Sequence, residues 1–140
     1  FSWVPEDPAT IPSTAPSFGG LSYTDPAMDS AAIQGGVQRV TRACTIAAFR
    51  LSWTKSDPAS AIIWAGAVYV RAGVCNWIFN ASTLHPSSPV TGEVYYDFSN
   101  GFYPVKLLPG DLVFAAFNGI SPGALAAARG ISLELFTLGG

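Results

Sequence analysis

The 140-residue sequence predicts an antiparallel β-sandwich. From residue 37 onward, short stretches rich in Val, Thr, Ile and aromatic residues are typical of β-strands. Turn signals separate these stretches at short intervals. No amphipathic pattern is long enough for a useful helix, since residues 124–129 offer one helical turn at most. Together these features favour an all-β domain built from two packed sheets.

The first 36 residues have a different composition and predict an extended, Pro-rich N-terminal arm. Five of the eleven prolines lie here, a spacing that favours polyproline-like backbone and forbids a helix. A disordered linker is one interpretation, but linkers rarely carry many apolar anchors. The anchors that predict an assembly arm are Trp3, Val4, Ile11, Phe18, Leu21 and Tyr23. We therefore expect an ordered arm over 1–36, lying on a neighbour or along its own domain, and a sandwich domain over 37–140.

The first predicted strand covers residues 37–53. Its apolar residues occupy even positions up to Ile46 and odd positions from Phe49. Side chains alternate between the two faces of a strand, so this switch predicts a bulge near Ala47 and Ala48.

Two apolar strands are predicted next, after a turn signal at 55–58. Residues 61–71 are almost continuously apolar, which predicts a strand covered on both faces. The strand at 74–80 is expected to turn three apolar side chains to one face: Cys75, Trp77 and Phe79.

The cysteines leave two alternatives open. Cys44 and Cys75 are joined by a disulfide if their strands are adjacent, and are otherwise two buried thiols. No Cys-x-x-Cys pair or His/Cys cluster exists, so a structural zinc site is not expected.

The clearest local signal predicts a hairpin around Asn100 and Gly101. Apolar residues alternate with polar ones over 94–98, and a second apolar alternation follows over 103–107. We expect these two stretches to pair through a four-residue loop at 99–102, which places Pro104 at a non-hydrogen-bonded site.

The remaining chain predicts two more strands. Residues 108–111 fit a type II turn, with proline second and glycine third. Strands are expected at 112–118 and 131–138, with a Gly- and Ala-rich connection between them.

Charge and apolar content bound the function. Only 11% of the residues are charged, against about 25% in typical soluble domains. With 49% hydrophobic residues, one small core cannot hide all the apolar side chains, so contacts with other copies or other proteins are expected. The net charge of −2 argues against nucleic-acid binding. The longest apolar run, 59–70, is shorter than the roughly 18–20 residues of a membrane span.

No catalytic, cofactor-binding or metal-ligating set emerges, and we expect a protein that is not an enzyme. His85, the only histidine, precedes a proline in a polar loop, and no Gly-x-Ser-x-Gly elbow is present. Glu93 and Asp97 lie about 13 Å apart along one strand, farther than glycosidase carboxylates. The acidic residues lack EF-hand spacing.

Aromatic residues are the remaining candidates for a site. Many are explained as core, but some suit a subunit interface or a sugar-stacking platform. The candidates are Trp53, Trp77, Tyr95 and Phe102.

The C-terminal third carries a family resemblance. A strand beginning at Tyr103, a Pro109-Gly110-Asp111 turn, an apolar strand from Leu112 to Phe117 and a final strand, Ile131-Ser-Leu-Glu-Leu-Phe, follow one another. This pattern resembles small trimeric jelly-roll domains of bacteriophage virion proteins, of the capsid-decoration, head-fibre or tail-fibre type. Tumour necrosis factor and complement globular-head domains share that architecture. The resemblance implies a jelly-roll-like sandwich and a homotrimer.

Together, the resemblance, the arm and the charge deficit predict a virion structural protein. We expect a capsid-decoration or fibre/tail component that assembles with its own copies and docks on neighbouring capsid or tail proteins. The alternative is a carbohydrate- or receptor-binding module, lectin-like or similar to a tumour-necrosis-factor ligand. That alternative would be secreted or at the cell surface, with a host glycan as partner.

Overall fold

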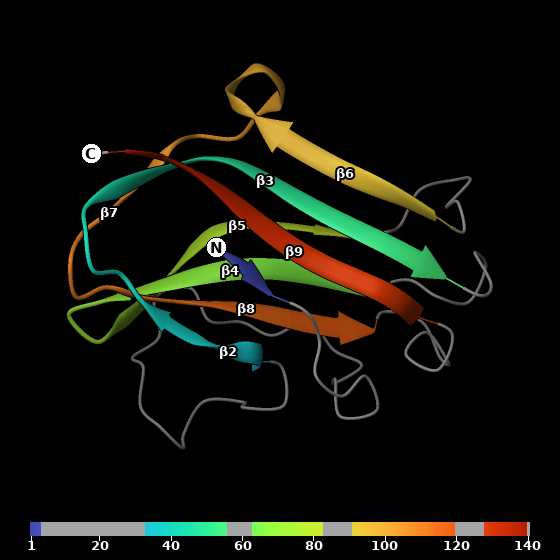
Figure 1. The fold of residues 1–140 in the computed structure, drawn as a ribbon, viewed down its shortest axis with the longest axis horizontal. Helices are drawn as coiled ribbons and strands as arrows, with labels where there is room; N and C mark the ends of the chain where they lie inside the picture. The colour runs from blue at the N-terminus through green and yellow to red at the C-terminus, as the bar shows by residue number, and fades with distance from the viewer. Residues whose placement is uncertain (4–32, 56–62, 83–90, 120–127, 140) are drawn as a thin grey trace.

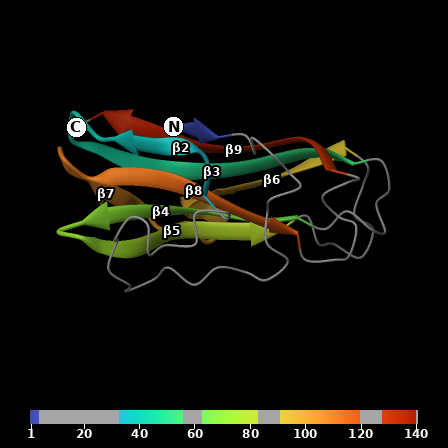
Figure 2. The ribbon, with the colours of Figure 1, turned by 90° about the horizontal axis from the view of Figure 1, so that it is seen from below.

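The protein folds as a sandwich of two antiparallel β-sheets, which confirms the predicted fold class (Figure 1). The computed structural model describes residues 1–3, 33–55, 63–82, 91–119 and 128–139. Figure 2 shows the two layers edge-on, with β3, β6 and β9 in one layer and β4 and β5 in the other. No helix in the described ranges is long and apolar enough to cross a membrane.

Each sheet combines strands from both halves of the chain. Sheet A has the order β1 (Ser2–Trp3), β9 (Ala128–Gly139), β3 (Cys44–Lys55) and β6 (Thr91–Asp97), and the short β7 (Val105–Leu107) also pairs with β3. Sheet B has the order β2 (Ile33–Arg39), β8 (Leu112–Gly119), β4 (Ile63–Arg71) and β5 (Val74–Ser82).

The strand pairs are nested from the two ends of the chain inward. β1 pairs with β9, β2 with β8, β3 with β6, and β4 with β5, all antiparallel. Such an arrangement is one long hairpin rolled into two sheets, which is the topology of a jelly roll.

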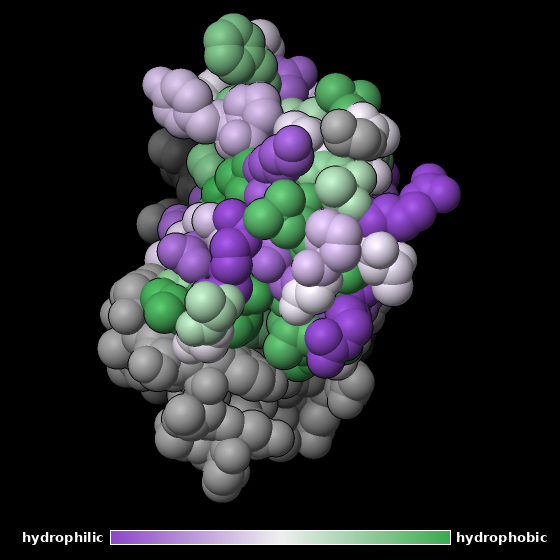
Figure 3. Space-filling view, turned by 90° about the vertical axis from the view of Figure 1, so that its left-hand side faces the viewer, coloured by the Kyte–Doolittle hydropathy of each residue, from purple (hydrophilic) through white to green (hydrophobic). Residues whose placement is uncertain are grey.

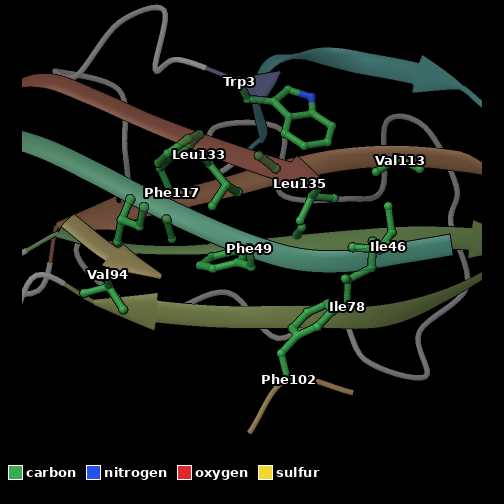
Figure 4. Close-up of a cluster of buried hydrophobic side chains, with 14 of the residues drawn as sticks. Trp3, Ile46, Phe49, Ile78, Val94, Phe102, Val113, Phe117, Leu133 and Leu135 are labelled. Carbon is green, nitrogen blue, oxygen red and sulfur yellow. The ribbon is translucent and has the colours of Figure 1, made fainter. Parts of the chain in front are cut away.

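The core lies between the sheets, where the inward side chains of both layers interdigitate (Figure 4). In β3 the inward residues are Ile46 and, beyond a register shift between Ile46 and Ala48, Phe49, Leu51 and Trp53. The predicted bulge is therefore confirmed. The single strand predicted over 37–53 is wrong, because residues up to Arg39 belong to β2 of sheet B and those from Cys44 belong to β3 of sheet A.

Sheet B is covered on both faces, as predicted for the strand at 61–71. Ala65 and Ala67 of β4 face the central core, and Val68 and Val70 join a second buried cluster on the opposite face. The prediction for β5 is wrong in one detail: Cys75 and Trp77 pack on the second cluster, whereas Phe79 packs on the central core. The pairing of Val68 with Trp77 and of Ala67 with Phe79 leaves one residue of β5 extra, and this bulge changes the face.

The predicted hairpin between 94–98 and 103–107 is wrong. β6 and β7 both pair antiparallel with β3, so they run in the same direction along it, whereas the two strands of a hairpin run in opposite directions. Between them, the 3-10 turn η2 (Phe98–Asn100) is closed by Asp97, whose carboxylate accepts from the Ser99 N–H at 2.9 Å. Gly101 ends the turn at φ +107°. Because η2 separates β6 from β7, both short strands pair with the same edge of the long strand β3.

The type II turn after β7 is present. The Asp111 N–H donates to the Leu108 carbonyl at 3.1 Å, and Gly110 adopts φ +95°. An L-residue is disfavoured at that angle, which explains the glycine.

Candidate assembly surface

The outer face of sheet A is the candidate functional surface. Side chains alternate along a strand, so the residues between the core positions of β3, β6 and β9 point away from the sandwich. On β9 these are Glu134, Phe136 and Leu138, next to the buried Leu133 and Leu135.

Four large apolar side chains are exposed on this face and the adjoining turn. Tyr95 is 45% exposed, Phe98 75%, Phe136 36% and Leu138 62%. Tyr95 lies on β6 and Phe136 on β9, and their rings approach to 6.2 Å, centroid to centroid, over the intervening strand β3. We call these four residues the outer patch.

A shallow cleft of about 550 Å³ adjoins the outer patch. Ala47 and Ala48, the bulge residues of β3, line it together with all four patch residues. Asp97 and Thr137 add polar groups. The bulge thus puts two small side chains beside large aromatic ones, and the difference in size leaves a hollow.

The charges beside the outer patch are paired with one another. The Arg50 guanidinium binds Glu134, with Nη2 to Oε1 at 2.7 Å, and approaches Glu93 at 3.9 Å. It also lies 5.2 Å from the centroid of the Phe136 ring, in cation–π geometry. The hydrogen bond and the negative charge of Glu134 raise the pKa of Arg50. The outer face therefore presents apolar groups beside a rim in which one arginine is paired with two glutamates.

Figure 3 shows the end of the sandwich where β7 and the C-terminus lie. Hydrophobic and hydrophilic residues are interspersed across it, and a hydrophobic group projects at the top, where the turn after β6 lies.

The candidate aromatic residues separate into core and surface. Trp53 and Phe102 are buried in the central core, and Trp77 is half-buried against the second cluster. Only Tyr95 of the four is exposed on the outer patch. The other patch residues were missed from the sequence. The signal was present on β9, where apolar residues at 136 and 138 alternate with Leu133 and Leu135 of the opposite face.

Of the predicted arm anchors, Trp3 is described, and it lies within its own sandwich. It is 2% exposed, and its indole Nε1 donates to the Gly36 carbonyl at 3.1 Å. Val4, Ile11, Phe18, Leu21 and Tyr23 lie outside the described residues. The boundary expected at residue 36 falls inside β2.

One buried ion pair was also missed from the sequence. The Asp111 carboxylate is 4% exposed and accepts hydrogen bonds from Arg71 Nη2 at 2.7 Å and from Arg71 Nε at 3.1 Å. Arg71 also donates to the Lys106 carbonyl at 2.9 Å. The pair joins the end of β4 to the turn before β8, which is a structural role.

The cysteines are free: Cys44, in sheet A, is half-buried and Cys75, in sheet B, is buried. Within the ranges the structure describes, no three His, Cys, Asp or Glu residues gather as metal ligands would. No protein-family model matches this sequence, and no curated protein matches it closely enough to be counted as a relative.

Proposed function

We propose that this protein is a virion structural protein, a capsid-decoration or fibre component, whose copies assemble through the outer face of sheet A. The observation that carries the proposal is the outer patch, with its exposed aromatic residues and the paired charges beside it. A homotrimer is the assembly that the family resemblance favours. Docking on a capsid or tail protein would place the assembly on the particle.

The size of the outer patch supports a subunit contact. At roughly 200 Å² for one fully exposed large side chain, its four residues expose about 400 Å². Patches of this size are often functional on single-domain proteins. A stable interface buries about 800 Å² on each partner, with an apolar centre and a polar rim. The outer patch would supply that centre, with Arg50, Glu93 and Glu134 at its rim.

Sedimentation at micromolar concentrations tests the assembly. We expect the wild-type protein to form an oligomer, and Leu138→Glu to weaken it at least tenfold because a charge would be buried at the contact. Val74→Glu is the matched control, since Val74 is 40% exposed but lies in the other sheet. A monomeric wild type, or a Leu138→Glu oligomer as strong as the control, contradicts the proposal.

Antibody labelling of native particles tests the location. We expect antibodies against this protein to bind intact virus particles. Purified particles that bind none of these antibodies contradict a virion role.

The cleft beside the outer patch supports a second candidate, binding of a host-surface glycan. Three aromatic rings and the Asp97 carboxylate line it, and sugars stack on such rings while carboxylates accept from their hydroxyls. A glycan array would give hits that Tyr95→Ala abolishes and Trp77→Ala leaves unchanged. An array without hits removes this candidate.

A further inference from the structure

The shortest strand of sheet A is held by a dense set of contacts. β1 pairs antiparallel with β9, with Ser2 opposite Glu134 and Trp3 opposite Leu133. The Phe1 amino group donates to the Leu135 carbonyl at 3.0 Å, and the Leu135 N–H returns a bond to the Phe1 carbonyl at 2.8 Å. Figure 1 shows β1 lying along β9. In the edge-on view of Figure 2, β1 lies next to both β9 and β2.

Trp3 anchors this strand in the core. Its ring stacks on Phe1, with centroids 6.1 Å apart and planes 11° from parallel. Figure 4 shows the indole beside Leu133 and Leu135. From β2, Gly36 accepts the indole N–H and Gln38 Nε2 donates to the Ser2 carbonyl at 3.3 Å. We call the groups that receive residues 1–3 the socket: Leu133–Leu135 of β9 and Gly36–Gln38 of β2.

The connection between β1 and β2 is far longer than the socket requires. The Trp3 side chain touches Gly36, yet 29 residues, 4–32, separate Trp3 from Ile33 in the sequence. Connections inside compact domains have a median of about 4–6 residues. A chain of 29 residues spans up to roughly 95 Å when extended. Its length is therefore sufficient to reach the socket of a neighbouring copy.

We propose that β1 is exchanged between copies, so that Phe1–Trp3 of one copy occupies the socket of the next. Every contact of residues 1–3 given above, apart from the Phe1–Trp3 stacking that travels with the strand, is made with β9 or β2. The same contacts would form in trans without loss, which is the condition for exchange of a structural element at low cost.

A strand β1 can then occupy either the socket of its own copy or that of a neighbour. The balance between these two arrangements depends on the local concentration of the copies. Copies held side by side raise the effective concentration of one strand at its neighbour's socket. The inference rests on the proposed self-assembly, because exchange needs an adjacent copy.

A disulfide across β1 and β9 reports which chain supplies the strand. Because Phe1 and Leu135 exchange both hydrogen bonds, the next pair, Ser2 and Glu134, is a non-hydrogen-bonded pair with its Cα atoms about 4.5 Å apart. That distance suits a disulfide. The variant S2C/E134C is assembled under reducing conditions, oxidised and run on a denaturing gel without reductant.

We expect covalent oligomers from S2C/E134C. The matched control is S52C/S132C, whose positions are Cα partners on β3 and β9 of the same chain. It keeps both native cysteines, so any oligomers formed through Cys44 or Cys75 would appear there as well, and it should give monomers.

The outcomes separate this inference from the proposed function. Sedimentation of the wild-type protein, which keeps Glu134 at the rim of the outer patch, tells whether the assembly exists. If it exists and S2C/E134C gives only monomers with an internal disulfide, exchange is overturned and the proposed assembly stands. Unreacted thiols at positions 2 and 134 overturn exchange too, since they mean that no strand occupies the socket. If the wild-type protein forms no assembly, both proposals fail.

Discussion

Replacing Asp111 by asparagine should destabilise the sandwich strongly, although it changes one functional group. The carboxylate accepts three hydrogen bonds: Arg71 Nη2 at 2.7 Å, Arg71 Nε at 3.1 Å and the Leu108 N–H at 2.8 Å. An asparagine amide has one oxygen, and its NH₂ would face a donor. At least one partly buried N–H group would then lose its acceptor, and the guanidinium would lose its counter-charge.

The expected cost is about 2–3 kcal/mol. Hydrogen bonds to charged groups contribute roughly 1.5–3 kcal/mol each, and breaking a buried ion pair costs about 3–5 kcal/mol. The expected cost lies below the range for a buried ion pair because the Arg71 side chain is 38% exposed and water can solvate it.

The contribution of the Asp111 carboxylate to the free energy of unfolding should depend on pH. Burial alone raises the pKa of Asp111, but the bonds from Arg71 and the Leu108 N–H outweigh it and hold the pKa below its usual range. A carboxyl with a lowered pKa in the folded state stabilises that state above the unfolded pKa of about 4, and this stabilisation disappears as pH falls through the folded value. The difference between wild type and Asp111→Asn should therefore be full at pH 6 and shrink below about pH 4.

Urea unfolding followed by tryptophan fluorescence, at one protein concentration, measures both effects. Glu93→Gln is the control, because Glu93 is exposed and 3.9 Å from Arg50, and it should change the unfolding free energy by less than about 0.5 kcal/mol. A cost below about 1 kcal/mol for Asp111→Asn at pH 6, or a cost that is the same at pH 6 and pH 2.5, would refute the reasoning.

Three further predictions concern the turn, the core and the thiols. Gly110→Ala meets no neighbour within 4 Å but must adopt φ +95°, so it should cost about 1 kcal/mol in urea unfolding, and an unchanged midpoint contradicts the strain. Phe49→Ala removes a fully buried ring that packs edge-on against Phe79 at 5.2 Å, and should cost about 3–5 kcal/mol; a loss under 1 kcal/mol would mean that the site refills. Burial raises the pKa of the Cys75 thiol, so peptide mapping after alkylation should find it modified more slowly than Cys44, and equal rates would contradict its burial.

Local patterns predicted much of this fold because each has a local physical cause. The change from even to odd apolar positions located the bulge at Ala47 and Ala48, since a strand cannot otherwise keep its apolar side chains on one face. The order of Pro109 and Gly110 identified the turn through their backbone preferences. The continuous apolar run over 61–71 indicated two covered faces, and Val68 and Ala67 are buried on opposite sides.

The errors arose where pairing between distant segments decides the outcome. Residues 94–98 and 103–107 carry alternation typical of a hairpin, but the long edge of β3 accepts both stretches, and nothing local encodes that competition. The outer patch was only partly predicted for a related reason. Trp53 and Tyr95 are both aromatic strand residues, and only the assembled sheets determine that the first is buried and the second exposed.

The nested pairing also has a consequence for synthesis. Among the described strands, β1 and β2 are synthesised before the others but find their partners only when β9 and β8 have been made. The hairpin of β4 and β5 is therefore the first of the described pairs that can form. Such long-range pairing folds slowly, on a scale of milliseconds to seconds. β9 carries Phe136 and Leu138 of the outer patch and also Leu133–Leu135 of the socket. A chain released before β9 is complete would therefore lack parts of both the outer patch and the socket. Under the proposed assembly, the order of translation would exclude such unfinished copies.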